Sequence, residues 1–289
     1  MNARSKFFLA SLRKRILQRG LACPACGSAK AECLDRKYAV VELVRCHSCA
    51  LMFRTPTTSV AGNASYYQED YQLGFTTEMP DATALAQLKA SKFRDTGKDF
   101  SDRLELLRRL GARPGHRLLD FGCSWGYGSW QFQQAGYEVQ SFEISRPRAN
   151  YARKMLNVDV KSVLREVTGQ YDIFFSAHVM EHVPNPAETI RFALDRLKPG
   201  GLFLALTPNG SLQQRAANPK AWHQAWGLNH PNMLDEVFYA RCFAGLPQIY
   251  ATHPYQAAKL EDFAAGKIPP TLPLEGGELL CAVCKPQKY

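Results

Sequence analysis

The sequence predicts an α/β fold with a small zinc ribbon at its N-terminal end. Short apolar runs at 118–121, 137–143 and 171–176 alternate with segments of helical periodicity, the pattern from which parallel sheets are built. Two C-x-x-C pairs, 23–26 and 46–49, precede these runs. A chain of 289 residues is long enough for one full-sized core and a satellite module of this kind.

The net charge of +10 belongs to the N-terminal end of the chain. Residues 1–60 hold eleven Lys and Arg against three acidic residues, whereas the remainder holds 25 against 23. Residues 1–21 lack the apolar run and cleavage site of a secretory signal, and no stretch approaches 18 uninterrupted apolar residues. Because the nine cysteines cluster in a way that suits a metal, we expect a cytoplasmic protein in a reducing compartment.

Residues 1–20 predict a short basic amphipathic helix. Apolar and basic side chains alternate so that a broad apolar face has cations beside it. One interpretation is peripheral docking to an anionic membrane at its inner face, or to a polyanionic partner. The other is a helix packed on its own protein.

The two C-x-x-C pairs, separated by nineteen residues, predict a structural zinc site. Each pair forms a tight knuckle, and two knuckles complete a tetrahedral shell of four sulfurs: Cys23, Cys26, Cys46 and Cys49. The segment Lys37 to Arg45 is rich in β-forming residues, as a ribbon needs. Iron is the alternative occupant, and unliganded cysteines are the alternative interpretation. We expect Cys33 and His47 to lie outside the metal shell.

A third pair, Cys281 and Cys284, has the same spacing, but we do not expect it to bind a metal. It lies in the last β run and has no partner pair. In an extended strand, residues i and i+3 point to opposite faces of the sheet. We therefore expect these cysteines to pack in the core.

The segment Leu118 to Gly128 predicts a strand, a tight turn and the start of a helix. Asp120 closes the apolar run, and Gly122 and Gly126 allow the backbone to approach a ligand closely. The D-x-G-x-x-x-G spacing is neither the G-x-G-x-x-G of a pyrophosphate site nor a P-loop. On its own, the turn also fits ordinary packing of a helix on a strand.

The next strand carries a second acidic residue at its end. Glu143 follows the glycine turn by about 20 residues, where a carboxylate suits the two hydroxyls of a ribose. A third apolar run ends in His178-Val-Met-Glu-His182, and the segment 197–201 is expected to end a helix before the strand Leu202 to Leu206.

With these features in order, the stretch Arg117 to Asn209 resembles the core of class I S-adenosylmethionine-dependent methyltransferases. "LLDFGCSWG" resembles the nucleoside loop, "EIS" the ribose acid, "YDIFFSAHVMEHV" the fourth strand and "LKPGGLFLALTPN" the fifth. The resemblance implies a Rossmann-like sheet of seven strands and S-adenosylmethionine as cofactor. The zinc ribbon is similar to that of sugar and small-molecule methyltransferases.

The resemblance also implies the residues that bind the cofactor. Two departures stand out, because Ser124 replaces a commoner glycine and Trp125 must find space, which we expect it to find against the ligand. No acid follows the third strand near Val163, so adenine would rely on backbone groups and apolar walls. The implied cofactor-binding residues are Asp120, Phe121, Gly122, Cys123, Gly126, Glu143, Ile144, Ala177 and His178.

Three histidines are candidates for the base that would remove a proton from a hydroxyl acceptor. His182 and His178 lie just beyond the fourth strand, at the edge of the sheet where ligands bind. His230 follows the fifth strand and could reach the same place. A lone histidine is more often structural, and Glu181 could either orient a histidine or cap a helix.

We expect four segments: a basic arm at 1–20, the ribbon at 21–55, a tyrosine-rich and helical linker at 56–112, and the methyltransferase domain at 113–289. By the resemblance, the tyrosines at 66–71 would help to cover the cofactor pocket, although ordinary packing would also explain them. Helices are expected over 81–94, 99–110 and 233–243, and strands over 248–255 and 279–284.

The motifs that the sequence lacks also limit the class of methyl acceptor. The chain has no [Asn/Asp]-Pro-Pro-[Tyr/Phe] run of the kind that stacks bases for methylation. The expected activity is O-methylation of a saccharide, a sugar-nucleotide or a related small molecule, with C-methylation of a sugar as a close second. The alternatives are an RNA methyltransferase that grips phosphates with its basic end, and a binding scaffold with a disabled site.

Overall fold

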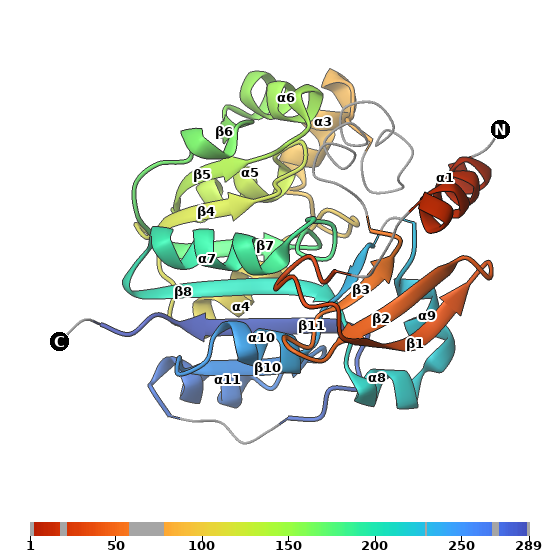
Figure 1. Cartoon of the computed structure of the whole chain (residues 1–289). Helices are drawn as coiled ribbons and strands as arrows, with labels where there is room; N and C mark the ends of the chain where they lie inside the picture. The colour runs from red at the N-terminus through yellow and green to blue at the C-terminus, as the bar shows by residue number, and fades with distance from the viewer. Residues whose placement is uncertain (1–2, 18–21, 58–77, 229, 268–271, 288–289) are drawn as a thin grey trace.

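The computed structural model describes the chain except for residues 1–2, 18–21, 58–77, 229, 268–271 and 288–289. Two sheets organise it: one of seven strands in the order β10-β11-β8-β7-β4-β5-β6, and one of four strands in the order β1-β2-β3-β9. Figure 1 shows the smaller sheet beside one end of the larger one.

The larger sheet is the expected Rossmann-like sheet of seven strands. β4, β5, β6, β7 and β8 are parallel, whereas β11 runs antiparallel to both of its neighbours, β8 and β10. Its strands are β4 (Arg117–Phe121), β5 (Glu138–Phe142), β6 (Asp159–Lys161), β7 (Tyr171–Ala177), β8 (Leu197–Pro208), β10 (Gln248–Thr252) and β11 (Glu278–Cys284).

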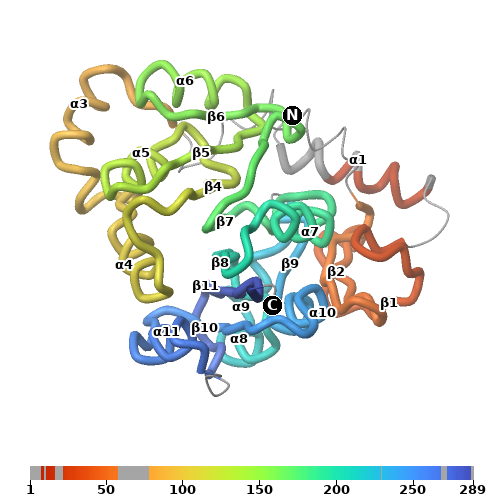
Figure 2. Tube along the Cα trace, turned by 90° about the vertical axis from the view of Figure 1, so that its left-hand side faces the viewer, coloured from red at the N-terminus to blue at the C-terminus, as the bar shows by residue number. Residues whose placement is uncertain are grey.

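Helices cover both faces of this sheet because alternate strand residues point in opposite directions. In β8, Phe203 and Ala205 join the cluster that includes α7 and α10, whereas Leu202, Leu204 and Leu206 join the cluster that includes α4, α5 and α11. Figure 2 shows these two groups of helices on either side of the strands. The helices are α4 (Ser101–Arg109), α5 (Tyr127–Gln134), α7 (Pro186–Arg196), α10 (Glu236–Cys242) and α11 (Ala257–Ala264).

The remaining elements lie around the two ends of the large sheet. α6 (Arg146–Leu156) follows β5, and α3 (Ala82–Ala90) packs beside it through Leu85. A 3-10 turn, η2 (Leu164–Glu166), follows β6, and α8 (Leu212–Ala217) and α9 (Pro219–Ala225) follow β8.

The smaller sheet begins with three consecutive antiparallel strands. These are β1 (Ala31–Lys37), β2 (Val41–Cys46) and β3 (Met52–Thr55), and they follow α1 (Ala3–Leu17). Its fourth strand, β9 (Asn232–Met233), comes from far along the chain and pairs with β3. The ribbon sheet is therefore completed by the segment that follows the fifth parallel strand of the core.

That fourth strand corrects one prediction. The expected helix over 233–243 begins only at Glu236, because Asp235 is its N-cap and its carboxylate accepts a hydrogen bond from the amide of Phe238. Asn232 and Met233 are extended and pair with β3 instead.

Two further boundaries differ from the prediction. The segment 197–201 is already strand rather than the end of a helix, since Leu197 pairs with Tyr171 beyond an irregularity in the ladder. The strand expected to reach Tyr255 ends at Thr252, just before Pro254, which cannot donate to a ladder.

Cys281 and Cys284 follow the prediction. Cys281 is fully buried on the face covered by α7 and α10, whereas Cys284 packs against the cluster on the opposite face. The tyrosine segment at 66–71 lies outside the described residues, and its role as a cover stays a prediction. No helix in the described ranges is both long and apolar enough to cross a membrane.

Candidate active site and metal centre

The loop between β4 and α5 turns at two positions that require glycine. Gly122 and Gly126 have φ of +87° and +88°. A Cβ on Gly122 would lie 2.3 Å from Cγ2 of Val179, and one on Gly126 would lie 2.8 Å from Cβ of Ala152. Ser124 between them also has a positive φ, 54°, a conformation that glycine adopts more readily than serine.

Trp125 occupies a different place from the one expected. Its indole is fully buried in a cluster with Phe93 and Tyr151, whose ring centroids lie 6.1 and 5.7 Å away. The expectation that this ring lies against the ligand is wrong, because packing among α3, α5 and α6 provides the space.

Two carboxylates lie buried at the carboxyl ends of neighbouring strands. Glu143, after β5, accepts hydrogen bonds from the amides of Ser124 (2.9 Å) and Ser145 (2.7 Å). Asp120, in β4, accepts one from the hydroxyl of Ser129 (2.6 Å). Burial raises the pKa of Glu143, and burial raises the pKa of Asp120 to about 7 despite the Ser129 hydroxyl.

This pair of carboxylates fits the cofactor of the resembling family. S-adenosylmethionine carries a positive sulfonium and an ammonium group, and a cation beside two buried carboxylates offsets their cost of desolvation. Glu143 is also fixed in one orientation by two amides, and its binding of the ribose hydroxyls stays a prediction. When bound, the cofactor supplies an activated methyl group; this chain supplies the loop, the acids and the walls.

The other residues implied in cofactor binding differ in whether their side chains or only their backbone groups could contact the cofactor. Phe121 stacks on Phe142 in the core, with ring centroids 5.0 Å apart, and Cys123 is buried, so both would act through their backbone. Ile144 and Ala177 are half-buried at the ends of β5 and β7. Contact of these residues with the cofactor stays a prediction.

His178 follows β7 with a positive φ of 55° and is held between two acids. Its Nε2 lies 2.8 Å from Glu278 Oε2, and its Nδ1 lies 3.5 Å from Glu181 Oε1. Burial alone would lower the pKa of His178, but the two carboxylates outweigh it and raise the pKa to about 9. The two carboxylates favour the protonated ring, which is the form that cannot act as a base, and the catalytic role of His178, like those of His182 and His230, stays a prediction.

His182 and His230 meet at nearly right angles beside Glu181. Their ring centroids are 4.7 Å apart with an interplanar angle of 80°, and His182 Nε2 lies 3.9 Å from Glu181 Oε1. Glu181 is 1% exposed. Burial favours its neutral form, but the neighbouring histidines, His178 first, outweigh that effect and lower the pKa of Glu181, so it is a carboxylate at neutral pH.

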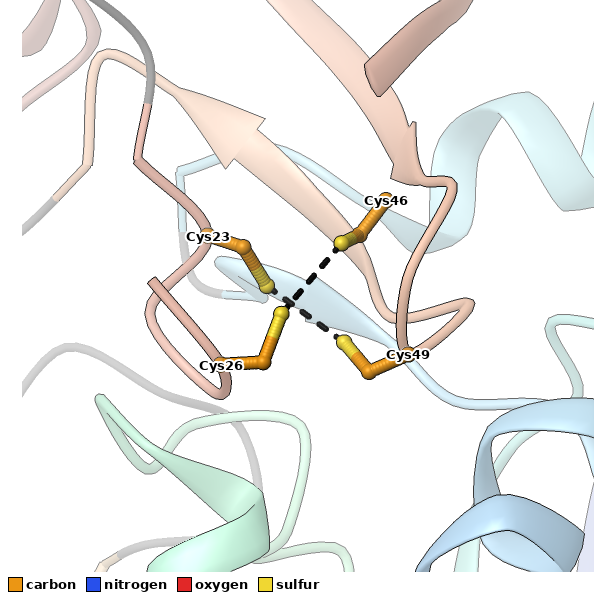
Figure 3. Close-up of side chains that lie close together, drawn as sticks. All are labelled: Cys23, Cys26, Cys46 and Cys49. Atoms are coloured by element: carbon orange, nitrogen blue, oxygen red, sulfur yellow. Dashed lines mark hydrogen bonds between the residues drawn. The ribbon is translucent and has the colours of Figure 1, made fainter. Parts of the chain in front are cut away.

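The four predicted cysteines converge as the sequence indicates (Figure 3). The sulfurs of Cys23 and Cys49 are 3.5 Å apart, as are those of Cys26 and Cys46. A tetrahedral zinc with four bonds of about 2.3 Å places its sulfurs about 3.8 Å apart, so this group could hold a zinc ion with little movement. Cys33 is exposed and lies outside the group.

The ribbon is joined to the loop that carries His230. Besides the pairing of β3 with β9, Arg45 of β2 forms an ion pair of 2.7 Å with Asp235, which is 1% exposed. Asn232 in β9 donates its amide to the carbonyl of Glu181 (3.2 Å) and its side chain to that of Val183 (2.7 Å). A continuous set of contacts therefore runs from the cysteine group to the histidines.

Sequence reasoning missed Glu278 as part of this site. Its carboxylate binds His178, Arg103 (2.7 Å) and the hydroxyl of Tyr255 (2.8 Å). Glu278 begins the last strand, and only the antiparallel insertion of that strand next to β8 brings it to His178. Nothing in the local pattern around residue 278 indicates this partner.

A family described as a methyltransferase domain matches residues 93–246, more than half of the chain. The chain belongs to this family. The order of its strands and the acidic residues at their ends make it a class I S-adenosylmethionine-dependent methyltransferase by family and fold, and S-adenosylmethionine is the cofactor of that class.

Two ubiquinone biosynthesis O-methyltransferases are among the similar proteins. Those of Bordetella avium and Acinetobacter baylyi are 32% and 30% identical over 131 and 162 residues, or 42% and 50% of this chain. The matches span 52% and 65% of those proteins' own length, so the chain covers between half and two thirds of these curated relatives.

A solved structure supports the fold. Geranyl diphosphate C-methyltransferase from Streptomyces coelicolor, in complex with Mg²⁺, geranyl diphosphate and S-adenosyl-L-homocysteine, superposes with a TM-score of 0.53 at 16% identity. The match covers 80% of this chain and 99% of that one. At this identity the likeness concerns the architecture alone.

Proposed function

We propose that this protein transfers the methyl group of S-adenosylmethionine to a hydroxyl of a small molecule, and that the acceptor is a saccharide or a sugar-nucleotide. The observation that carries O-methylation is the meeting of Glu181, His182 and His230 where β7 ends. Sulfonium methyl transfer needs positioning more than activation, so the groups that prepare the hydroxyl decide the chemistry. The relatives' names also specify O-methylation.

His230 is set up to act on a hydroxyl. Its Nδ1 lies 2.5 Å from the carbonyl of Ala225, which can only accept a hydrogen bond. The proton of the neutral ring therefore sits on Nδ1, which leaves the lone pair on Nε2 for the proposed chemistry.

The cations of the ribbon favour a small acceptor over RNA. Arg45 binds Asp235, Arg15 of α1 binds Glu42 (2.9 Å), and the ammonium of Lys37 binds the carbonyl of Trp226. Arg54 donates to the carbonyls that follow α9, those of residues 227 and 228. Because these charges hold the chain together, they contribute little to a basic face that would track phosphates.

The test begins with the cofactor. Calorimetric titration of S-adenosylmethionine into the full chain should show binding in the micromolar range. Glu143→Ala, which removes a charged partner of two hydroxyls, should weaken that binding about 100-fold or more. The control is Glu138→Ala, at the exposed start of the same strand.

The acceptor is then found by measuring S-adenosylhomocysteine released with saccharides, sugar-nucleotides and RNA. The position of the new methyl group on the product distinguishes oxygen from carbon. Turnover on RNA alone, lost steeply as salt rises, would contradict the proposal. So would a failure of the wild-type chain to bind the cofactor, which is the result that a scaffold predicts.

A further inference from the structure

The most unusual side chain beside the candidate active site is the buried carboxylate of Glu181. Within the described part of the chain, neither of its oxygens accepts a hydrogen bond of good geometry. Basic groups approach without closing on it: His178 Nδ1 lies 3.5 Å and His182 Nε2 lies 3.9 Å from its Oε1. The His178 imidazolium is its charge partner at 3.5 Å, but a buried carboxylate whose oxygens accept no hydrogen bond of good geometry can still gain from a cation that bonds to it directly.

Two imidazoles converge on the same carboxylate. The ligand atoms of Glu181, His182 and His230 all lie within 4.8 Å of one another. Ligands bonded to one ion at about 2.0–2.2 Å are separated by roughly 3–4 Å, so small rotations of the side chains would close the group around a metal.

The surroundings of the three side chains resemble those of a metal site. A histidine that binds a metal usually donates its other ring N–H to a carbonyl, which fixes the tautomer, and His230 does so through Nδ1 to Ala225. The Glu181 backbone is in turn held by the amide of Asn232. These contacts position the ligands before any ion arrives.

We infer that Glu181, His182 and His230 bind one divalent cation of the zinc, cobalt or manganese type, separate from the four-cysteine group. Two nitrogens and one carboxylate suit such ions and leave positions open for an acceptor hydroxyl. Its role in catalysis, unlike its binding, rests on the proposed function.

In that role His230 Nε2 would hold the ion instead of taking a proton itself, and the ion would make an acceptor hydroxyl bound to it more acidic. The hydroxyl proton passes to solvent, and the oxygen's electron pair forms the new bond to the methyl carbon. The carbon–sulfur bond breaks with its electron pair kept by sulfur, so that charge and atoms balance without another reactant.

The test is titration of Co²⁺ into the full chain with its cysteine site already filled by Zn²⁺, without cofactor or acceptor. We expect one further equivalent to bind, with a visible spectrum that lacks the sulfur-to-metal bands of thiolate ligation. Glu181→Gln and His230→Gln should each weaken this binding about 100-fold or more. The matched control is His253→Gln, a histidine outside the group, which should bind as the wild type does.

Folding is checked by zinc content and thermal unfolding. Glu181→Gln and His230→Gln should both retain zinc and a cooperative unfolding transition, and Co²⁺ should raise the melting temperature of the wild type but not that of either variant. Unchanged Co²⁺ binding in both variants, or no second equivalent in the wild type, would overturn the inference. Because binding is measured without turnover, the failure of methyl transfer would be recognised separately.

Discussion

The four-cysteine group and the Glu181–His182–His230 group lie at two ends of one set of contacts, yet they differ in kind. The cysteines come from two tight knuckles and form a closed shell of four like ligands. The second group combines a carboxylate and two imidazoles from two distant segments, and three ligands of this kind do not close the shell of a metal ion. The difference teaches that a site built for stability is local in sequence, whereas a site built for chemistry is assembled by the fold.

The largest expected effect comes from opening the closed shell. Cys46→Ser should release zinc and lower the free energy of unfolding by about 4 kcal/mol. Because β3 pairs with β9, it should also lower turnover at the His230 loop. Zinc content, thermal unfolding and S-adenosylhomocysteine release measure the three effects. Cys33→Ser, in the same ribbon but outside the shell, should leave all three unchanged.

A second prediction concerns Asp120, a buried carboxylate outside both groups. Its folded pKa of about 7 lies above the ordinary value of 3.8, so the folded state holds the proton more tightly. The stability linked to this group is complete below about pH 4 and is lost as the pH rises through 7, by about 4 kcal/mol. Unfolding by urea across this range should show the decline in cofactor-free protein. Asp120→Asn should flatten it, and an equal slope in both proteins would contradict the prediction.

A third prediction concerns the ion pair that connects the ribbon to the segment carrying His230. Arg45→Ala leaves the buried Asp235 carboxylate without its ion pair and should cost about 2 kcal/mol of stability. Zinc should remain bound, because no cysteine is altered. Arg36→Ala removes a cation that is 67% exposed and should cost less than about 0.5 kcal/mol. Equal losses of stability in the two variants would show that the ion pair of Arg45 with Asp235 stabilises the fold no more than an exposed cation does.

The smallest effect on either group is expected from α1. Phe8, Leu9, Leu12 and Ile16 are exposed, and at 100° per residue they fall within about 100° of arc. We propose that this stripe, with the exposed Arg13 beside it, binds an anionic membrane surface.

Replacing Leu9, Leu12 and Ile16 by Gln should abolish sedimentation with phosphatidylglycerol vesicles and leave stability and metal content unchanged. Leu212→Gln, an exposed leucine elsewhere, is the control. Binding that survives the triple replacement would refute this role for α1.

Local pattern was enough to predict part of the molecule. Strand periodicity, the glycines at 122 and 126 and the two knuckles each depend on neighbours in the chain, and the structure confirms the seven-stranded sheet and the convergence of the cysteines. What could not be predicted depends on distant partners. β9 looked like the start of a helix because only β3, far away in sequence, makes it a strand. The role of Glu278 and the burial of Trp125 have the same origin.

The ribbon and the methyltransferase fold also share a hydrophobic cluster. Val41, Leu43 and Met52 of the ribbon pack with Trp222, Trp226 and Met233 of the larger part. Neither part can hold these side chains away from water without the other. In a calorimeter the whole chain should therefore melt in one cooperative transition, and zinc should raise the melting temperature of the enzyme as a unit rather than that of its ribbon alone.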